Sequence, residues 1–183
     1  MRILKKGTKI VAFVALTAAS SFAQDSFGKK IPSVTMYPAE IFNVTRGRAN
    51  GVDLRFHVDS GFHINSNKPS AEYLIPTTLK LEAPTDIVVG GVTYPPGQEE
   101  SFAFAPNEKL SVYTGNFYLS VNVRPLANVL PSKYELRGIL RYQACDNAAC
   151  YPPRQLPVRF EVKVVKAPPA PARNPAQSPH VHN

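Results

Sequence analysis

The feature that most constrains the fold is a period-two alternation of apolar and polar side chains. In residues 52–58, Val, Leu, Phe and Val alternate with Asp, Arg and His, and residues 117–124 and 158–164 repeat this pattern. Successive side chains of a strand point to opposite faces of a sheet, so this period is typical of a strand with one face buried and one face in water. The sequence therefore predicts three long amphipathic strands.

Weaker segments of the same kind predict a larger all-β domain. Further strands are expected at residues 33–37, 40–45, 78–81, 87–89, 100–104 and 134–144. Turn signals separate them at residues 48–51, 90–91, 95–97 and 106–107. No stretch keeps a helical period for three turns, and many short strands at this spacing favour an antiparallel β-sandwich.

The two ends of the chain differ in composition from the middle. Residues 1–23 combine four basic residues with an apolar run at residues 10–19 and a small-x-small site, Ser21-Phe-Ala23, which predicts a cleavable signal peptide and export. Residues 167–183 are rich in Pro and Ala and lack large apolar side chains, so we expect a disordered tail. One sandwich domain is predicted between them, at residues 24–166.

The charge of the chain does not favour nucleic-acid binding. The chain has 21 basic and 13 acidic residues, and its formal net charge is +8. Four of the basic residues lie in the predicted signal peptide, and the others are scattered, with no basic cluster interleaved with aromatic residues. We therefore expect no nucleic-acid partner.

The chain has two cysteines, Cys145 and Cys150, with four residues between them. In an exported protein two such neighbours are expected to form a disulfide with each other. A loop this short gives the bond a stabilising effect of only about 2 kcal/mol in the chain-entropy model. The spacing is therefore compatible with an inert staple and, equally, with a site of reversible thiol–disulfide exchange.

The strand pattern places this pair at a hairpin. The expected strand at residues 134–144 leads into Cys145, residues 146–149 form a turn, and Cys150 leads through Pro152 and Pro153 to the last strand. Because proline cannot donate a ladder hydrogen bond, this stretch is expected at an edge or in irregular structure. The disulfide is therefore predicted at one accessible end of the sandwich.

Three motifs resemble the N-terminal periplasmic domain of DsbD, the transmembrane thiol reductant conductor. Tyr142-Gln-Ala-Cys145 followed by Cys150-Tyr-Pro-Pro153 resembles the signature of that domain. Gly61-Phe-His-Ile-Asn-Ser66 is similar to an aromatic-rich segment of the family, and Val112-Tyr-Thr-Gly115 is similar to its cap loop. His63 and Asn65 stand where some members have tyrosine. The likeness covers most of residues 33–165.

The resemblance implies an immunoglobulin-like antiparallel β-sandwich that relays electrons in the periplasm. It implies that Cys145 and Cys150 are the redox pair. Its partners would be a separate membrane-embedded thiol reductant and periplasmic thioredoxin-like proteins, including cytochrome c maturation factors. The residues expected to cover or shield the pair are Val112, Tyr113, Tyr142, Tyr151 and His63. No metal and no small-molecule cofactor is expected.

The residues around the pair leave the attacking cysteine open. An anion beside a thiol raises its pKa, so Asp146 would disfavour the thiolate of Cys145, whereas Arg141, Arg154 or His63 would favour a thiolate if they lay close. The tyrosines are equally compatible with ordinary sandwich packing. The main alternative function is a non-catalytic binding or assembly module in which the disulfide only fixes a loop.

Overall fold

The computed structural model describes residues 33–168, and these form an all-β domain of twelve strands. The strands are β1 (Val34–Met36), β2 (Phe42–Thr45), β3 (Asn50–Val58), β4 (His63–Asn65), β5 (Thr78–Glu82), β6 (Ile87–Thr93), β7 (Gln98–Phe102), β8 (Ala105–Tyr113), β9 (Asn116–Pro125), β10 (Lys133–Tyr142), β11 (Ala144–Cys145) and β12 (Arg154–Val165). The predicted signal peptide and almost all of the predicted tail lie outside the described residues.

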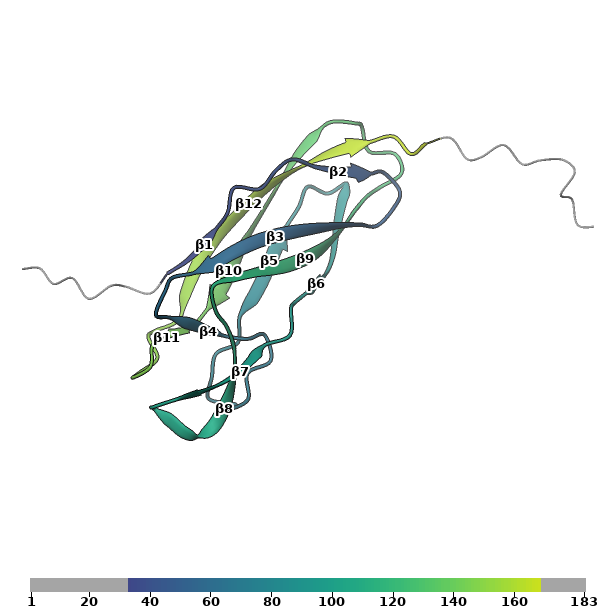
Figure 1. Cartoon of the computed structure of the whole chain (residues 1–183). Helices are drawn as coiled ribbons and strands as arrows, with labels where there is room; N and C mark the ends of the chain where they lie inside the picture. Colours follow the sequence, from purple (N-terminus) through teal and green to yellow (C-terminus); the bar gives the residue numbers. More distant parts are fainter. Residues whose placement is uncertain (1–32, 169–183) are drawn as a thin grey trace, which may run out of the picture. The chain divides into compact units, whose positions relative to one another are not determined.

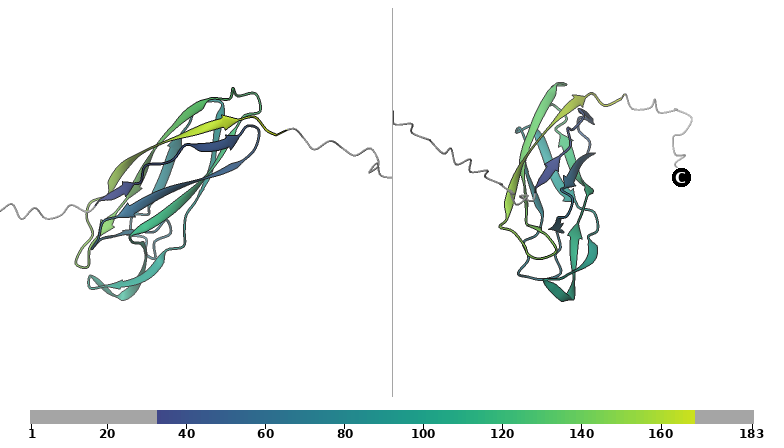
Figure 2. Two further views of the ribbon diagram at one scale, coloured as in Figure 1. Left: turned by 45° about the horizontal axis from the view of Figure 1, so that its top comes forward. Right: turned by 60° about the vertical axis from the view of Figure 1, so that its left-hand side comes forward.

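Two four-stranded sheets form the sandwich (Figures 1 and 2). One has the strand order β1-β3-β9-β6 and the other the order β2-β12-β10-β5. Neighbouring strands are antiparallel except β2 and β12, which pair in parallel. The predicted immunoglobulin-like antiparallel sandwich is thus confirmed as the fold class.

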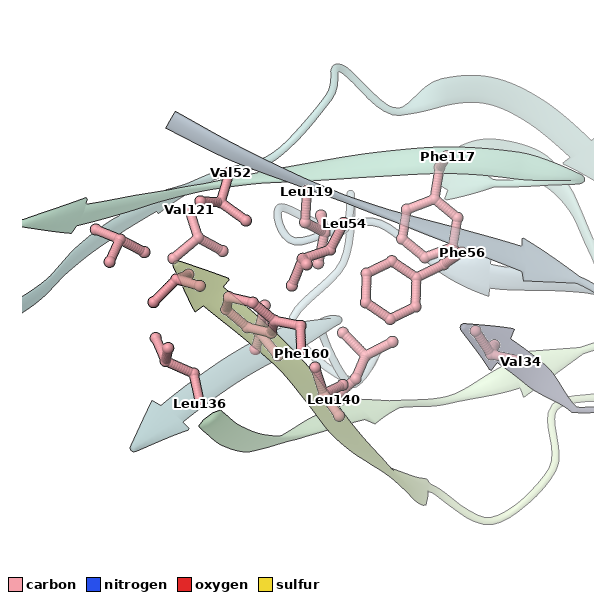
Figure 3. Packing of buried hydrophobic residues seen from close by; sticks show 14 of the residues in the cluster. Val34, Val52, Leu54, Phe56, Phe117, Leu119, Val121, Leu136, Leu140 and Phe160 are labelled. Carbon is pink, nitrogen blue, oxygen red and sulfur yellow. The ribbon is translucent and has the colours of Figure 1, made fainter. Parts of the chain in front are cut away.

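The core lies between the two sheets (Figure 3). Leu54 and Phe56 of β3 and Phe117 of β9 face Leu136 of β10 and Phe160 of β12. The rings of Phe56 and Phe117 stack with their centroids 5.4 Å apart. Full burial of a side chain of this size contributes roughly 1.5–3 kcal/mol, so these alternating positions hold the sheets together.

The predicted alternation is confirmed in the long strands. Along β9, every second residue from Phe117 to Pro125 is buried, while Asn116, Tyr118, Asn122 and Arg124 are exposed. β3 and β12 alternate in the same way. A shift of one residue would expose the whole apolar set, so the pattern also fixes the register of these strands.

A third, smaller sheet stands at one end of the sandwich, with the order β11-β4-β8-β7 (Figure 1). Ile64 of β4, Tyr113 of β8 and Ala144 of β11 lie in one row across it and belong to the main core. This sheet therefore continues the hydrophobic core on one face. Its other face carries the residues flanking that row.

Two of the predicted turns are wrong. Gly90 and Gly91 lie within β6, where the pairing with β9 shifts between Val89 and Val92, so they form a bulge rather than a chain reversal. Residues 106–107 lie in β8, and the chain reverses earlier, at residues 103–104, between β7 and β8. The strands β4 and β8 were not predicted at all.

Within residues 33–168, the structure contains no helix with the length and apolar character needed to span a membrane.

Candidate functional site

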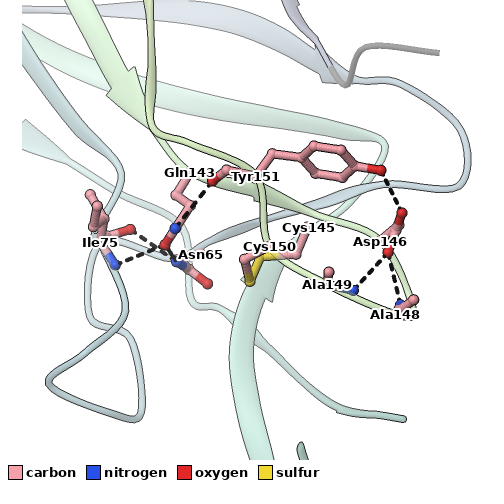
Figure 4. Close-up of a disulfide and its surroundings, with 9 residues drawn as sticks. All are labelled: Asn65, Ile75, Gln143, Cys145, Asp146, Ala148, Ala149, Cys150 and Tyr151. Carbon is pink, nitrogen blue, oxygen red and sulfur yellow. Dashed lines mark hydrogen bonds between the residues drawn. A yellow bond between two sulfur atoms is a disulfide. The ribbon is translucent and has the colours of Figure 1, made fainter. Parts of the chain in front are cut away.

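The disulfide joins Cys145 and Cys150 at the end of the sandwich that carries the small sheet (Figure 4). The S–S distance is 2.04 Å and the Cα atoms are 3.9 Å apart. The two residues also form an antiparallel bridge, so they face each other across the base of a tight loop. Cys145 is fully buried, whereas Cys150 is partly exposed. The two sulfurs of the bond are thus presented differently to solvent.

The loop between the cysteines has its own hydrogen bonds (Figure 4). The Asp146 carboxylate accepts the backbone N–H groups of Ala148 (2.8 Å) and Ala149 (2.9 Å) through Oδ1. Its Oδ2 accepts the hydroxyl of Tyr151 at 2.6 Å. In the backbone, Asp146 donates to Ala149 (3.0 Å) and Tyr151 donates to Ala144 (2.8 Å). The hydrogen bond to Asp146 raises the pKa of Tyr151, because it holds the phenolic proton.

A second network fixes the strand that leads into the pair (Figure 4). The Gln143 Oε1 atom accepts the Asn65 side-chain amide at 3.1 Å and the Ile75 backbone N–H at 3.2 Å. Its Nε2 donates to the Tyr151 carbonyl at 3.2 Å, and Asn65 also donates to the Ile75 carbonyl at 3.0 Å. Gln143 therefore ties the segments on both sides of the disulfide to β4 and to the chain that follows it.

His63 lies directly opposite Cys145, on the neighbouring strand β4. Its ring stacks on Phe102 with centroids 3.8 Å apart, and the ring of Phe104 is 6.3 Å away. The side chain is only 3% exposed. Burial lowers the pKa of His63 from 6.5 to about 4, although the nearby Asp146 carboxylate acts in the opposite direction. The ring is therefore neutral at neutral pH.

The reversal between β7 and β8 covers this face of the small sheet. It brings Phe102 and Phe104 onto His63, and the backbone N–H of Ala103 donates to Oδ1 of Asn147, inside the disulfide loop, at 3.3 Å. We call residues 102–104 the aromatic cap. A hollow of about 390 Å³ opens beside it, and its lining includes His57, Phe62, His63, Glu100, Phe102 and Asn147.

Two of the residues expected to cover the pair, Val112 and Tyr113, lie elsewhere. Val112 and Tyr113 belong to strand β8 and not to a loop, and β4 separates them from β11. The Tyr113 ring stacks on Phe117 at 5.1 Å in the main core, and its hydroxyl lies 2.7 Å from Oδ1 of Asn67. Val112 packs in a small cluster beneath the cap. Residues 112–113 thus form a strand where a cap loop was expected, and the chain reverses instead at residues 103–104.

The two expected shielding tyrosines beside the cysteines differ in environment. Tyr142 is buried in the main core, where its hydroxyl accepts the Val34 N–H at 3.3 Å. Tyr151 is partly exposed and meets Phe62 edge to face, with centroids 5.9 Å apart. Tyr151 therefore stands at the surface beside Cys150, and Tyr142 packs as a core residue.

Sequence reasoning missed the aromatic cap, Asn147 and the Gln143–Asn65 network. Asn147 and Ala103 are separated by 44 positions in the chain. A signal for the cap was present, because Phe102 and Phe104 closely follow the turn at residues 95–97. In residues 33–168, no group of three or more His, Cys, Asp or Glu side chains is placed to hold a metal ion.

No protein-family model matches the chain, and no curated protein matches it. Among solved structures, it is similar to the N-terminal domain of DsbD from Neisseria meningitidis in the reduced form, with 23% identity over 62% of this chain and 77% of that chain and a TM-score of 0.39.

Two further structures resemble the chain. One is the complex between the DsbD N-terminal and PilB N-terminal domains of the same organism, with 24% identity over 61% of this chain and 73% of that chain and a TM-score of 0.37. The other is AggA, the major subunit of aggregative adherence fimbriae type I from Escherichia coli, with 11% identity over 74% of this chain and 95% of that chain and a TM-score of 0.31. These matches concern the fold and assign no function to the chain.

Proposed function

We propose that the protein carries out thiol–disulfide exchange in the periplasm through Cys145 and Cys150. It would receive reducing equivalents from a separate membrane-embedded thiol reductant and pass them to thioredoxin-like proteins. The observation that carries the proposal is the unequal exposure of the two cysteines at an accessible end of the sandwich. An exchange site needs one sulfur that a partner can reach and a second that resolves the intermediate.

The hydrogen bonds of the loop support exchange over a purely structural bond. Asp146 alone accepts two backbone N–H groups and the Tyr151 hydroxyl, and two backbone hydrogen bonds close the loop at its base. The bond also joins neighbours that already form an antiparallel bridge. A staple at this position adds only about 2 kcal/mol in the entropy model. The loop is therefore held closed by groups that do not depend on the disulfide.

The unequal exposure of the cysteines supports one division of roles in the proposed exchange, with Cys150 as the sulfur that partners attack and Cys145 as the resolving sulfur. A partner thiolate attacks Sγ of Cys150, a bond forms between these two sulfurs, the Cys145–Cys150 bond breaks, and Cys145 leaves as a thiolate that takes up a proton. The second partner thiol then displaces Cys150, so that two electrons pass to the pair and the partner becomes a disulfide. In the other direction, Cys150 attacks a partner disulfide and Cys145 resolves the mixed disulfide.

The aromatic cap would restrict which thiols reach the pair. Phe102 covers His63 opposite Cys145, and one hydrogen bond, Ala103 to Asn147, connects the cap to the disulfide loop. A partner that displaces this contact would approach Cys150, while a protein without a complementary surface would be excluded. The cap thus supplies selectivity rather than chemistry.

The reduction potential of the pair tests the proposal. The mature protein is equilibrated with glutathione buffers, and the fraction of free thiol is read by alkylation and mass spectrometry. We expect a potential well above about −300 mV, the value below which structural disulfides lie. Reduced thioredoxin should also reduce the Cys145–Cys150 disulfide of the wild-type protein at a rate typical of its other disulfide substrates. A potential below that limit would assign the bond to a structural role.

One observation favours the alternative, a binding module. On the outer face of β3 and β9, the Arg55 guanidinium lies 4.2 Å from the ring centroid of Tyr37 and 5.9 Å from that of Tyr118. The two tyrosines are 37% and 53% exposed. Tyr and Arg are enriched among the residues that contribute most to binding at protein interfaces. If the double variant C145A/C150A still captured a partner with unchanged affinity, this surface would carry the function.

A further inference from the structure

Two buried polar atoms at the site have no hydrogen-bond partner among the described residues: Nε2 of His63 and Oδ1 of Asn65. Both side chains belong to β4 and project to the same face, since they are two residues apart. An unpaired buried polar group costs free energy, so each such group in a folded protein calls for an explanation. The Asn65 side chain already donates two hydrogen bonds through its nitrogen. Of the two side chains, His63 is the one that lies opposite a cysteine.

The strand register places Cys145 beside His63 on one face of the small sheet. Ile64 and Ala144 pair with each other and point into the main core. The next pair along the ladder, His63 and Cys145, must therefore share the opposite face. Side chains at directly opposite positions of an antiparallel pair have Cβ atoms about 4.5–5.5 Å apart. An imidazole and a thiol group at such positions are within reach of each other.

We propose that His63 is the proton partner of Cys145. In the reduced protein, the Cys145 thiol donates a hydrogen bond to Nε2 of His63. In the resolving step, His63 takes the thiol proton. This inference rests on the proposed exchange function and adds a residue that the exchange itself does not require. The proposal explains why Nε2 of His63 has no partner in the disulfide form, since a disulfide sulfur has no proton to donate. In the reduced form, the Cys145 thiol has a proton and can donate it.

The resolving step balances in atoms and electrons. The Cys145 S–H bond breaks and its proton moves to Nε2 of His63. The Cys145 sulfur attacks Sγ of Cys150, so the Cys145–Cys150 bond forms and the bond between Cys150 and the partner sulfur breaks. The partner leaves with the electron pair as a thiolate, and it recovers the proton from His63 directly or through water. In reverse, the protonated ring supplies the proton to Cys145 as it leaves.

The surroundings of His63 keep its nitrogen available. Burial lowers the pKa of His63 to about 4, so the ring is neutral and carries a lone pair at neutral pH. The Asp146 carboxylate, from the disulfide loop, acts in the opposite direction and would stabilise the protonated ring during transfer. The other titratable groups that line the adjacent hollow are Glu100 of β7, His57 of β3 and Asp59. Proton transfer concerted with sulfur attack avoids an isolated buried thiolate.

A purely structural reading of His63 makes a different prediction. The ring stacks on Phe102, and phenylalanine at this position would stack equally well without a buried unpaired nitrogen. If packing were the whole role, His63→Phe would leave the exchange chemistry unchanged. If the nitrogen handles the proton, the same substitution would slow one chemical step and spare the other.

The test uses the full mature protein and the aromatic disulfide reagent DTNB. Reduced protein releases one thiolate chromophore when Cys150 attacks and a second when Cys145 resolves the mixed disulfide. For H63F, we expect the first release to stay within about threefold of the wild-type rate and the second to slow by roughly 10²-fold, the lower end of the usual general-base contribution. His57→Phe is the matched control, because it replaces another histidine, whose ring bonds to Asn116.

The outcomes separate the two proposals. If H63F and the wild type release the second chromophore at equal rates, His63 is not the proton partner, and the exchange function stands. If the wild type gives no second release, both proposals fail.

An NMR titration of the wild-type protein needs no variant. The His63 ring signals should shift as the thiols ionise in the reduced protein and stay constant over the same alkaline range in the oxidised protein. Identical titration curves in the two states would overturn the assignment of His63.

Discussion

The Tyr151 hydroxyl donates a 2.6 Å hydrogen bond to the Asp146 carboxylate. The same carboxylate caps the backbone of the loop through Ala148 and Ala149. One acidic side chain therefore both closes the segment between the cysteines and places a negative charge beside them. The two effects can be separated, because an amide retains the acceptor oxygen and loses the charge.

Asp146→Asn should accelerate the reaction of the reduced pair with DTNB at neutral pH. A neighbouring anion disfavours a thiolate, so its removal raises the thiolate fraction, and we expect a severalfold faster first release. The amide oxygen of the variant side chain can still accept from Ala148 and Ala149, but its NH2 group cannot accept from the Tyr151 hydroxyl, so the melting temperature should fall only by the loss of that one hydrogen bond. Asp53→Asn, on the outer face of β3, is the control. A rate for D146N equal to that of the control would show that the carboxylate does not influence the thiols.

Phe102→Ala should open the covered face of the small sheet. The ring of Phe102 lies 3.8 Å from that of His63, and its loss exposes the groups beside Cys145. We expect the reduced thiols to react severalfold faster with iodoacetamide, measured by mass spectrometry. Phe42→Ala is the control. It removes a ring that packs on Phe160 in the sheet β2-β12-β10-β5, and it should leave the rate of alkylation unchanged. Equal rates for the two variants would mean that the aromatic cap shields nothing.

The stability of the folded protein should depend on pH through His63. Because the folded pKa is about 4 and the ordinary value is 6.5, the unfolded chain binds more protons between these values. Stability is therefore fully present above pH 6.5 and is lost as the pH falls toward 4, by at most about 3 kcal/mol. Urea titrations across this range measure it. H63F should flatten that part of the profile, and an unchanged profile would exclude His63 as its cause.

Gly138→Ala should destabilise the sheet at the junction of β10 and β5. A Cβ atom at this position would meet the Lys80 carbonyl oxygen and the Leu81 side chain well inside contact distance. Since the backbone of Lys80 cannot shift without an energetic cost, we expect the free energy of unfolding to fall by about 1–3 kcal/mol, measured by thermal melting. Gly91→Ala is the matched control, because nothing lies within 4 Å of a Cβ there. A stable G138A protein would show that β5 moves freely against β10.

The long strands could be predicted because each has alternating buried and exposed side chains. β3 and β9 each have one face in the core and one face in water, and the alternation records this. All three residues of β4 are buried, so this strand shows no alternation to detect. Residues 106–107 carry a local turn signal but lie in a strand, because β8 pairs with β7 and this hairpin reverses earlier in the chain.

The candidate site could be predicted in part for the same reason. Cys145, Cys150 and His63 lie in local motifs, and the structure places His63 opposite the disulfide-bonded Cys145. The two phenylalanines of the aromatic cap were visible in the sequence, but their place over His63 was not, because the contact of Ala103 with Asn147 joins segments 44 residues apart. Tyr113 was expected to shield the pair, but it lies in one row with Ile64 and Ala144, and its ring packs in the main core.

The direction of β12 has a practical consequence for experiments on this protein. The strand begins at Arg154, close to the disulfide, and continues for 12 residues to Val165 at the other end of the sandwich (Figure 1). At about 3.3 Å per residue, its two ends are separated by roughly 36 Å. A fluorophore, affinity tag or surface linkage attached just beyond Val165 would therefore sit far from the cysteines. An immobilised sample prepared in this way would present the end with the disulfide to the solution.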